Sequence, residues 1–367
     1  MKNRTRKVQN YLKRHQQSQE YKNILHKRLR THINRFGINS VYVINNYSNE
    51  GKRIQVVHTK YKKINAPNNI SMINNTEEMI EFINRVEEQK NKRYNTFIEL
   101  KDVIDVGYDG LVVLLSIMTS FQANKIKFNG SFPRNKEARK LITDSGFFEY
   151  LYKPIPEQQN YNFQKDKGGI FTHASKIADS KLSSEIIKDA SKHIWGEEKR
   201  CPGVQRILLE LMQNTNNHAS EVAKGVQHWW MSISYSEKKA HFTFLDYGVG
   251  VFKSLENKKE GSKFFGWKEL LSKVFAFRTN YEVLRLILHG ELHKTVTHNY
   301  YRGKGLPGIY EVYKRNQINS LYIITNDVYS NISNDEYCEL DKGFSGTFVY
   351  FELSYNNGSF KIEDEND

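Results

Sequence analysis

The chain has 367 residues, enough for two or three domains, and 38% of them are hydrophobic. Its longest apolar run, Leu111 to Ile117, is too short to span a membrane, and its basic N-terminus lacks the apolar stretch of a signal peptide. The two cysteines, Cys201 and Cys338, are too few for a disulfide framework or a cysteine zinc site. We therefore expect a cytoplasmic protein with no membrane contact.

The net charge of +14 lies entirely in the first 63 residues. This segment holds 16 Lys or Arg and two acidic residues, Glu20 and Glu50, whereas the remainder holds 39 basic and 39 acidic residues. Clustered cations release counterions from an anionic polymer, so residues 1–63 are a candidate contact for nucleic acid. A solvated basic helix face would account for the same charge equally well.

Residues 1–93 are predicted to form a basic region of helix and β-hairpin. Apolar residues recur every three or four positions between residues 5 and 36, which predicts one or two amphipathic helices. The β-rich runs 40–46 and 53–61 flank a polar turn and predict a hairpin. Asn75 or Thr76 is the expected cap of a helix that ends near Lys92.

Residues 94–153 alternate strands and helices in the order βαβα, which predicts a small sheet with helices packed on it. The expected elements are strands at 97–100 and 125–128 and helices at 110–121 and 137–145. Three stretches, residues 98–103, 108–111 and 139–148, resemble the STAS-like domains found with anti-sigma-factor regulators.

Asp109 departs from the pattern of the STAS antagonists. In that family a phosphorylatable serine stands just before the Gly-Leu that opens the helix, whereas Asp109 precedes Gly110-Leu111 here. A carboxylate cannot accept phosphate in that serine chemistry, which argues against a phosphorylation switch. We expect Asp109 to cap the helix instead.

Pro154 and Pro156, followed by a polar run, predict a linker at residues 154–169. It precedes a second domain at 170–355, and residues 356–367 are predicted to be an acidic tail.

The first of four motifs in this second domain lies on a helix predicted over 202–219. Glu210, Asn214 and His218 are spaced by four and therefore share one face of the helix. A polar stripe on a helix with otherwise apolar faces indicates a site, because buried polar groups need partners. A surface helix with a Glu-Asn pair would show the same pattern.

The second motif is an apolar strand from residue 242 that ends in Asp246-Tyr247-Gly248-Val249-Gly250. An acceptor at a strand end can bind the exocyclic amine of a purine, and glycines let a ligand approach the backbone closely. The third motif, Arg302-Gly303-Lys304-Gly305-Leu306, leads into a helix predicted over 307–315 and combines backbone donors with charge for an anion. The fourth is Gly346-Thr347 at the start of an alternating strand.

In this order and spacing the four motifs resemble the N, G1, G2 and Gly-Thr boxes of the GHKL superfamily, which includes gyrases, heat-shock chaperones, histidine kinases and anti-sigma kinases. The resemblance implies a Bergerat fold, an α/β sandwich in which helices cover one face of a mixed sheet. It also implies ATP and Mg²⁺ as ligands.

The resemblance assigns a role to each motif. Asn214 would hold the magnesium, and Glu210 would orient or deprotonate the attacking water. Asp246 would bind the adenine amine, and Thr347 would share that contact through water.

The glycines Gly248 and Gly250 would shape the adenine side, and Gly303, Lys304 and Gly305, flanked by Arg302 and Leu306, would cradle the phosphates. His218 stands where the anti-sigma kinases also have histidine, and a polar residue at a helix end explains it equally well. Residues 251–302 would form the mobile ATP lid, with helices predicted at 266–277 and 281–289.

These features favour a Mg²⁺-dependent ATPase switch that signals through its N-terminal region to a protein partner, in bacterial stress or phage-defence regulation. An anti-sigma-type protein serine kinase and a nucleotide-sensing adaptor that binds nucleic acid are the alternatives. A histidine kinase is disfavoured because no phosphoacceptor helix precedes the pocket. Homo-oligomerisation stays open.

Overall fold

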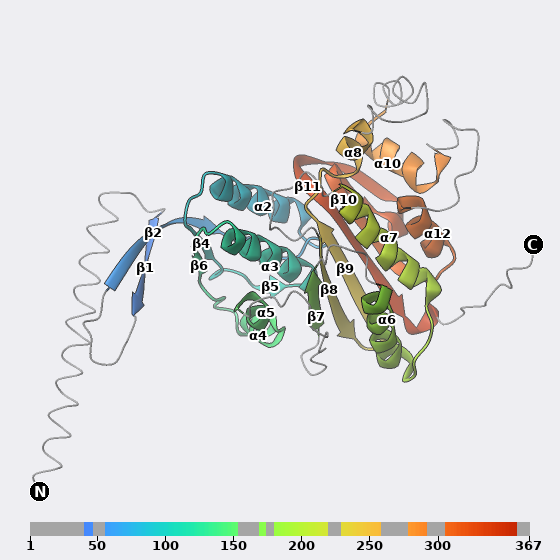
Figure 1. Ribbon diagram of the computed structural model, residues 1–367, viewed down its shortest axis with the longest axis horizontal. Helices are drawn as coiled ribbons and strands as arrows, with labels where there is room; N and C mark the ends of the chain where they lie inside the picture. The colour runs from blue at the N-terminus through green and yellow to red at the C-terminus, as the bar shows by residue number, and fades with distance from the viewer. Residues whose placement is uncertain are drawn as a thin grey trace, which may run out of the picture.

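A computed structural model of the chain describes residues 40–46, 56–152, 169–173, 180–218, 229–257, 278–291 and 305–357 (Figure 1). The predicted basic helices, nearly all of the linker, the helix at 266–277 and most of the acidic tail lie outside these residues.

The described residues form an α+β structure with parallel and antiparallel strand pairs. The strands are β1 (Ser40–Asn46), β2 (Val56–Asn65), β3 (Asn69–Ile70), β4 (Thr96–Glu99), β5 (Asp105–Val106), β6 (Phe128–Gly130), β7 (Gly169–His173), β8 (Trp229–Ser236), β9 (Lys239–Asp246), β10 (Asn319–Asn331) and β11 (Glu336–Ser354). The helices are α2 (Thr76–Asn91), α3 (Tyr108–Ala123), α4 (Lys136–Asp144), α5 (Phe147–Tyr152), α6 (Ser180–Trp195), α7 (Pro202–His218), α8 (Val251–Asn257), α10 (Asn280–Leu288) and α12 (Leu306–Lys314), with short 3-10 turns η4 (Ile332–Asn334) and η5 (Tyr355–Asn357).

The N-terminal sheet has the strand order β1-β2-β4-β6. β1 and β2 are antiparallel, which confirms the predicted hairpin, and β2, β4 and β6 run parallel to one another. Because Lys62 of β2 pairs with Thr96 of β4, the hairpin and residues 94–152 belong to one sheet. The boundary predicted between residues 93 and 94 therefore does not coincide with a break in the structure.

The fourth strand of this sheet, β6, begins later than the sequence indicated. Residues 125–128 were expected to form a strand, but β6 begins at Phe128. The reason is the turn after α3, where Asn124 is the C-cap and Lys125 has a positive φ of 57° that a strand does not accept.

The C-terminal sheet has the order β10-β11-β9-β8-β7, and all four described pairings are antiparallel. The expectation of a mixed sheet here is therefore wrong for the described strands. β8 ends at Ser236 and β9 begins at Lys239, and such a short connection can join only antiparallel neighbours.

Helices α6, α7, α10 and α12 cover one face of the C-terminal sheet (Figure 1). Side chains alternate along each strand, so Phe242 and Phe244 of β9 contact these helices while Leu245 points to the opposite face. Both faces of the sheet therefore carry apolar side chains that pack against other elements.

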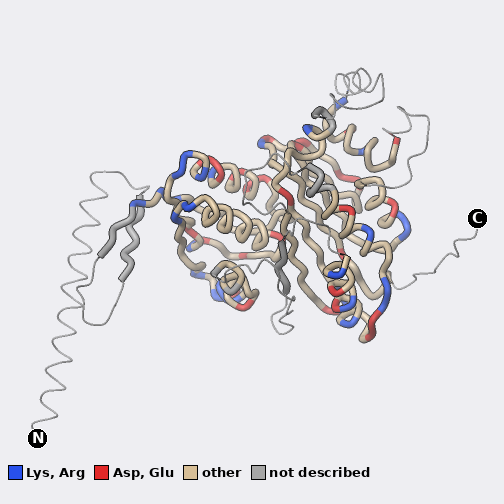
Figure 2. Tube along the Cα trace, in the orientation of Figure 1, with Lys and Arg blue, Asp and Glu red and all other residues tan. Residues whose placement is uncertain are grey.

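The opposite face is covered by the N-terminal unit, with α2 and α3 lying between the two sheets (Figure 1). Helix α3 is buried on all sides, and Asp109 is its only charged residue (Figure 2). A helix that is apolar all round is stable only inside a core. No helix in the described parts of the chain is long and apolar enough to cross a bilayer, α3 included.

Polar contacts fix the register of this packing. Ser116 Oγ of α3 lies 2.9 Å from Tyr247 Oη, which follows β9. Ser232 Oγ of β8 donates to the Tyr108 carbonyl oxygen at 3.2 Å. Because Trp230, Leu245 and Phe348 of the C-terminal sheet share one hydrophobic cluster with α3, the two units have a common core.

Asp109 is not the helix cap that the sequence suggested. The N-cap is Gly107, and Asp109 lies inside the first turn of α3. Its carboxylate accepts hydrogen bonds from Ser71 Oγ and Met72 N, both at 2.7 Å, and burial raises the pKa of Asp109 above its usual range against the effect of these bonds. Asp109 therefore ties the loop after β3 to α3.

The shared core predicts a large effect of Phe348→Ala. Phe348 is fully buried in the cluster between the units, so the cavity should lower the free energy of unfolding by about 3–5 kcal/mol. Tyr355→Ala is the matched control, because Tyr355 is 54% exposed and its removal should cost less than about 0.5 kcal/mol. Urea denaturation measures both, and equal stability of the two variants would contradict a common core.

Candidate functional site

The second and fourth sequence motifs lie side by side. Asp246, at the end of β9, pairs with Thr347 of β11 on one side and with Trp229 of β8 on the other. Asp246 is in register with Phe242 and Phe244, whose side chains face the helices. The Asp246 carboxylate, the Thr347 hydroxyl and the Trp229 indole are thus brought to the helix-covered face of the sheet.

The Asp246 carboxylate is partly buried and accepts a hydrogen bond from Gly248 N at 2.8 Å. Burial raises the pKa of Asp246 to about 6, while hydrogen bonds from Gly248 and Thr347 oppose that increase. Asp246 is therefore ionised at neutral pH and is a strong acceptor. Beside it, the buried Trp229 indole N–H has no hydrogen-bond partner within the described residues.

Two glycines allow the backbone to fold tightly around Asp246. Gly346 has φ +129°, and a Cβ there would lie 1.9 Å from the Asp246 carbonyl oxygen. Gly250 has φ +77°, and a Cβ there would lie 2.4 Å from Asn326 Oδ1. No side chain fits at either position without moving its neighbours.

Residues in the middle of β10, where its register with β11 shifts, support this turn and were not predicted to belong to the site. Thr325 Oγ1 accepts from Val251 N and donates to the Gly346 carbonyl oxygen, both at 3.0 Å. Asn326 Oδ1 accepts from Phe252 N at 3.2 Å. The only sequence signal was Asn-Asp after a β-branched run, which indicates a break in a strand but not its neighbours.

The first and third motifs also meet. Glu210 of α7 accepts hydrogen bonds from Arg206 Nε at 3.1 Å and from the backbone N–H of Gly305. Gly305 is the N-cap of α12, with φ +77°. The carboxylate of Glu210 therefore binds one of the backbone donors that the third motif was expected to offer to phosphate.

Other predicted site residues are placed only in part. Asn214 and His218 lie on the last two turns of α7, with their side chains outside the described part, and Leu306 is the first residue of α12. Gly248 lies in the turn before α8. Arg302, Gly303 and Lys304 lie outside the described residues. The described contacts thus join the motifs in two pairs, Asp246 with Thr347 and Glu210 with Gly305.

The segment between the second and third motifs is described at residues 251–257 and 278–291. The predicted helix at 281–289 is confirmed as α10, which begins with a capping box of Thr279 and Glu282. The Asn280 side chain donates to Asp327 at 2.7 Å, which ties α10 to β10.

The described residues contain no group of three or more His, Cys, Asp or Glu side chains that could hold a metal ion. Mg²⁺ does not need such a group, because it is commonly bound through one or two protein oxygens plus substrate phosphates. Asn214, four residues after Glu210, lies on α7, and its side chain is outside the described part.

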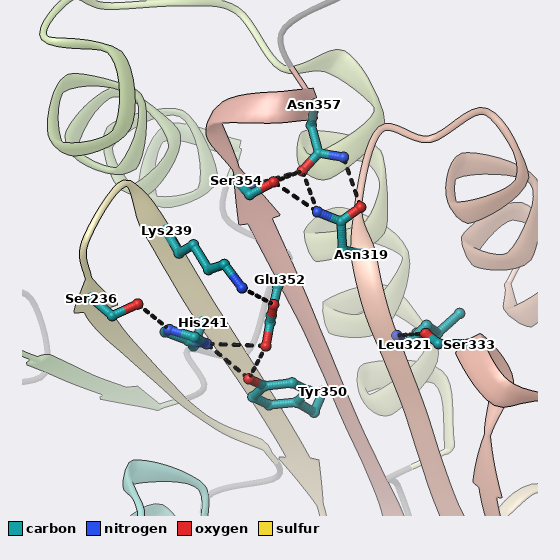
Figure 3. A network of polar contacts seen from close by, with 10 residues as sticks. All are labelled: Ser236, Lys239, His241, Asn319, Leu321, Ser333, Tyr350, Glu352, Ser354 and Asn357. Carbon is teal, nitrogen blue, oxygen red and sulfur yellow. Dashed lines mark hydrogen bonds and ion pairs between the residues drawn. The ribbon is translucent and has the colours of Figure 1, made fainter.

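A separate polar network lies on the face of the C-terminal sheet that is turned away from α6 and α7 (Figure 3). His241 Nε2 lies 2.7 Å from Ser236 Oγ, and its Nδ1 lies 2.8 Å from Tyr350 Oη. Hydrogen bonds from His241 and Tyr350 and the charge of Lys239 lower the pKa of Glu352 to about 2. The network joins the β8–β9 turn to β11 and includes no predicted site residue.

Comparison with protein-family models gives no match, and no curated protein matches the sequence significantly.

The geometry predicts that Gly346→Ala disrupts the turn around Asp246. The added Cβ meets backbone at 1.9 Å and the residue keeps a positive φ, so we expect a loss of about 3 kcal/mol or more in the free energy of unfolding. Gly290→Ala is the control for φ alone, because Gly290 has φ +69° and nothing within 4 Å of its Cβ position. Its cost should be about 1 kcal/mol. Equal costs in thermal unfolding would contradict the close approach.

Proposed function

We propose that the C-terminal unit is a GHKL-type domain that binds ATP with Mg²⁺ and acts as an ATPase switch. The observation that carries the proposal is the pairing of the Asp246 carboxylate with Thr347 at a strand end surrounded by Gly248, Gly250 and Gly346. An acceptor, a hydroxyl and a close-approaching backbone are the groups that recognise a purine amine.

In this proposal Asp246 accepts the adenine amine. Its ionised carboxylate at neutral pH makes that bond charge-assisted, and the bond is among the stronger ones a neutral ligand can form. Thr347 donates or accepts beside it through its hydroxyl, and the buried Trp229 indole N–H is a further donor at the same strand end. Guanine presents a carbonyl oxygen where adenine has its amine, so an anionic Asp246 favours ATP over GTP.

Glu210 and Asn214 act on the phosphate side. Asn214 would hold Mg²⁺, which would supply charge neutralisation at the phosphates. Glu210 orients the attacking water and takes its proton as general base. The Glu210 carboxylate accepts the Gly305 N–H, so a phosphate bound at the start of α12 would compete with Glu210 for that donor.

The same motif that holds adenine contacts the N-terminal unit. Tyr247 directly follows Asp246, and its hydroxyl lies 2.9 Å from Ser116 Oγ in α3. A rearrangement of the Asp246–Gly250 turn on nucleotide binding would therefore move a side chain anchored in the STAS-like unit. This contact supports a switch that reports its nucleotide state to a protein partner through the N-terminal unit.

A serine kinase of the anti-sigma type is the second candidate, on the strength of the STAS-like unit in the same chain. That unit does not present a substrate serine at the position of Asp109. Ser71, the serine that contacts Asp109, is 2% exposed and donates its hydroxyl to the Asp109 carboxylate. A kinase would therefore have to act on a serine of another protein.

Two substitutions on α7 test the proposal. Glu210→Gln should keep Mg²⁺-ATP binding but lower phosphate release by a factor of about 100 or more, because the general base is lost. Asn214→Ala should instead weaken binding of a non-hydrolysable ATP analogue only when Mg²⁺ is present. Titration calorimetry and a phosphate-release assay measure the two effects, and a phosphotransfer assay on the same samples identifies a kinase.

Glu311→Gln is the matched control. The Glu311 carboxylate on α12 also lies near Arg206, with Oε2 at 3.8 Å from Arg206 Nη1. It should leave turnover unchanged. Unaltered ATP binding and turnover in folded Glu210→Gln and Asn214→Ala proteins would refute the assignment.

A further inference from the structure

A cluster of exposed cations lies at one edge of the N-terminal sheet, on the opposite side of that unit from the C-terminal sheet (Figure 2). It is called the basic edge, and its members come from β2, the α2–β4 turn and the α3–β6 turn. They are Lys60, Lys62, Lys92, Arg93, Lys125 and Lys127.

Hydrogen bonds to Asn95 draw these segments together. The Asn95 side chain donates to the Lys60 carbonyl oxygen and accepts from Lys127 N, both at 3.3 Å. The Arg93 guanidinium donates to the Asn124 carbonyl oxygen at 3.3 Å, which joins the two turns. The basic edge is therefore one surface, although its residues span more than sixty positions of the sequence.

An exposed aromatic ring lies within the basic edge. Tyr94 is 41% exposed, and the Lys62 ammonium lies 4.2 Å from the centre of its ring. Lys92 also pairs with the Glu88 carboxylate one turn earlier on α2. Cations around a stacking platform are the combination that single-stranded nucleic acid recognises.

Helix-end electrostatics explain only part of the cluster. Lys92 and Lys125 follow the C-termini of α2 and α3, where the helix dipole favours a cation. Lys60 and Lys62 lie on β2, and Lys127 directly precedes β6, so the helix dipole does not explain the position of these three lysines. These three lysines lie beside the cations at the helix ends, and together they form the positive surface of the basic edge.

The most basic part of the chain joins the sheet at this edge. Residues 1–39 contain eleven Lys or Arg and one acidic residue, and they lead into Ser40, which pairs with Lys62. The first residue of β1 thus lies beside a member of the basic edge.

We propose that the basic edge binds single-stranded nucleic acid, with its cations on the phosphates and Tyr94 stacked on a base. This inference is independent of the nucleotide pocket, which lies in the C-terminal unit.

The test uses the full chain and a fluorescent oligothymidylate of about 20 nucleotides at several salt concentrations. The variant Lys125→Asn with Lys127→Gln removes two charges beyond residue 63, and Asn tolerates the positive φ at position 125. We expect affinity to fall at least about 5-fold and the slope of log K against log salt to become shallower by about 1.4, at about 0.7 per phosphate contact in single strands.

Lys181→Gln with Lys188→Gln on α6 changes the net charge equally and should bind like the unmodified chain. Tyr94→Leu should weaken binding about 5-fold without changing the salt slope, because stacking releases no counterions. Thermal unfolding checks that each variant is folded.

Binding by Lys125→Asn/Lys127→Gln equal to that of the α6 control would overturn the proposal, since the contact would then lie elsewhere, for example in residues 1–63. Binding of phosphatidylserine vesicles with the same dependence on these residues, and no binding of the oligonucleotide, would also overturn it in favour of a membrane contact.

Discussion

Helix α3 lies between two sheets, and its apolar side chains pack against both. The five consecutive residues from Leu111 to Leu115 are all at most 1% exposed, and full burial of each stabilises the fold by about 1.5–3 kcal/mol. Their sum is of the order of the whole stability of a domain, about 5–15 kcal/mol. Separating the N-terminal unit from the C-terminal sheet would expose much of this surface, so the two units are expected to unfold together.

This packing places the proposed nucleotide site and the N-terminal unit on opposite faces of one sheet. Two consecutive residues contact the two sides. Asp246, the last residue of β9, faces the helix-covered side, and Tyr247, which follows it, contacts Ser116 of α3. In the proposed function, a change at Asp246 would reach α3 through the adjacent residue Tyr247. The basic edge lies beyond α3, at the far side of the N-terminal unit.

Elements with strong periodicity could be predicted from the sequence, whereas long-range neighbours could not. α2, α7 and α12 begin and end within two residues of their predicted bounds, because apolar spacing, caps and prolines are local signals. Asp109 was predicted to be a helix cap because the sequence does not show its hydrogen-bond partner. That partner, Ser71, is 38 residues away in the chain. Thr325 was missed because its role depends on β10 lying beside β11. The mixed sheet was inferred from a family resemblance rather than from residues, and the described strands are antiparallel instead.

Hydrogen exchange of the full chain without nucleotide, with ADP and with a non-hydrolysable ATP analogue plus Mg²⁺ tests the central claim most directly. The backbone amides of Gly248, Val251 and Thr347 report on the turn around Asp246, and that of Gly305 reports on the start of α12. The account predicts slower exchange around Asp246 with both nucleotides, and a further slowing at Gly305 with the ATP analogue alone. Identical exchange at all of these amides in the three states would contradict a nucleotide site between β9, β11 and α7.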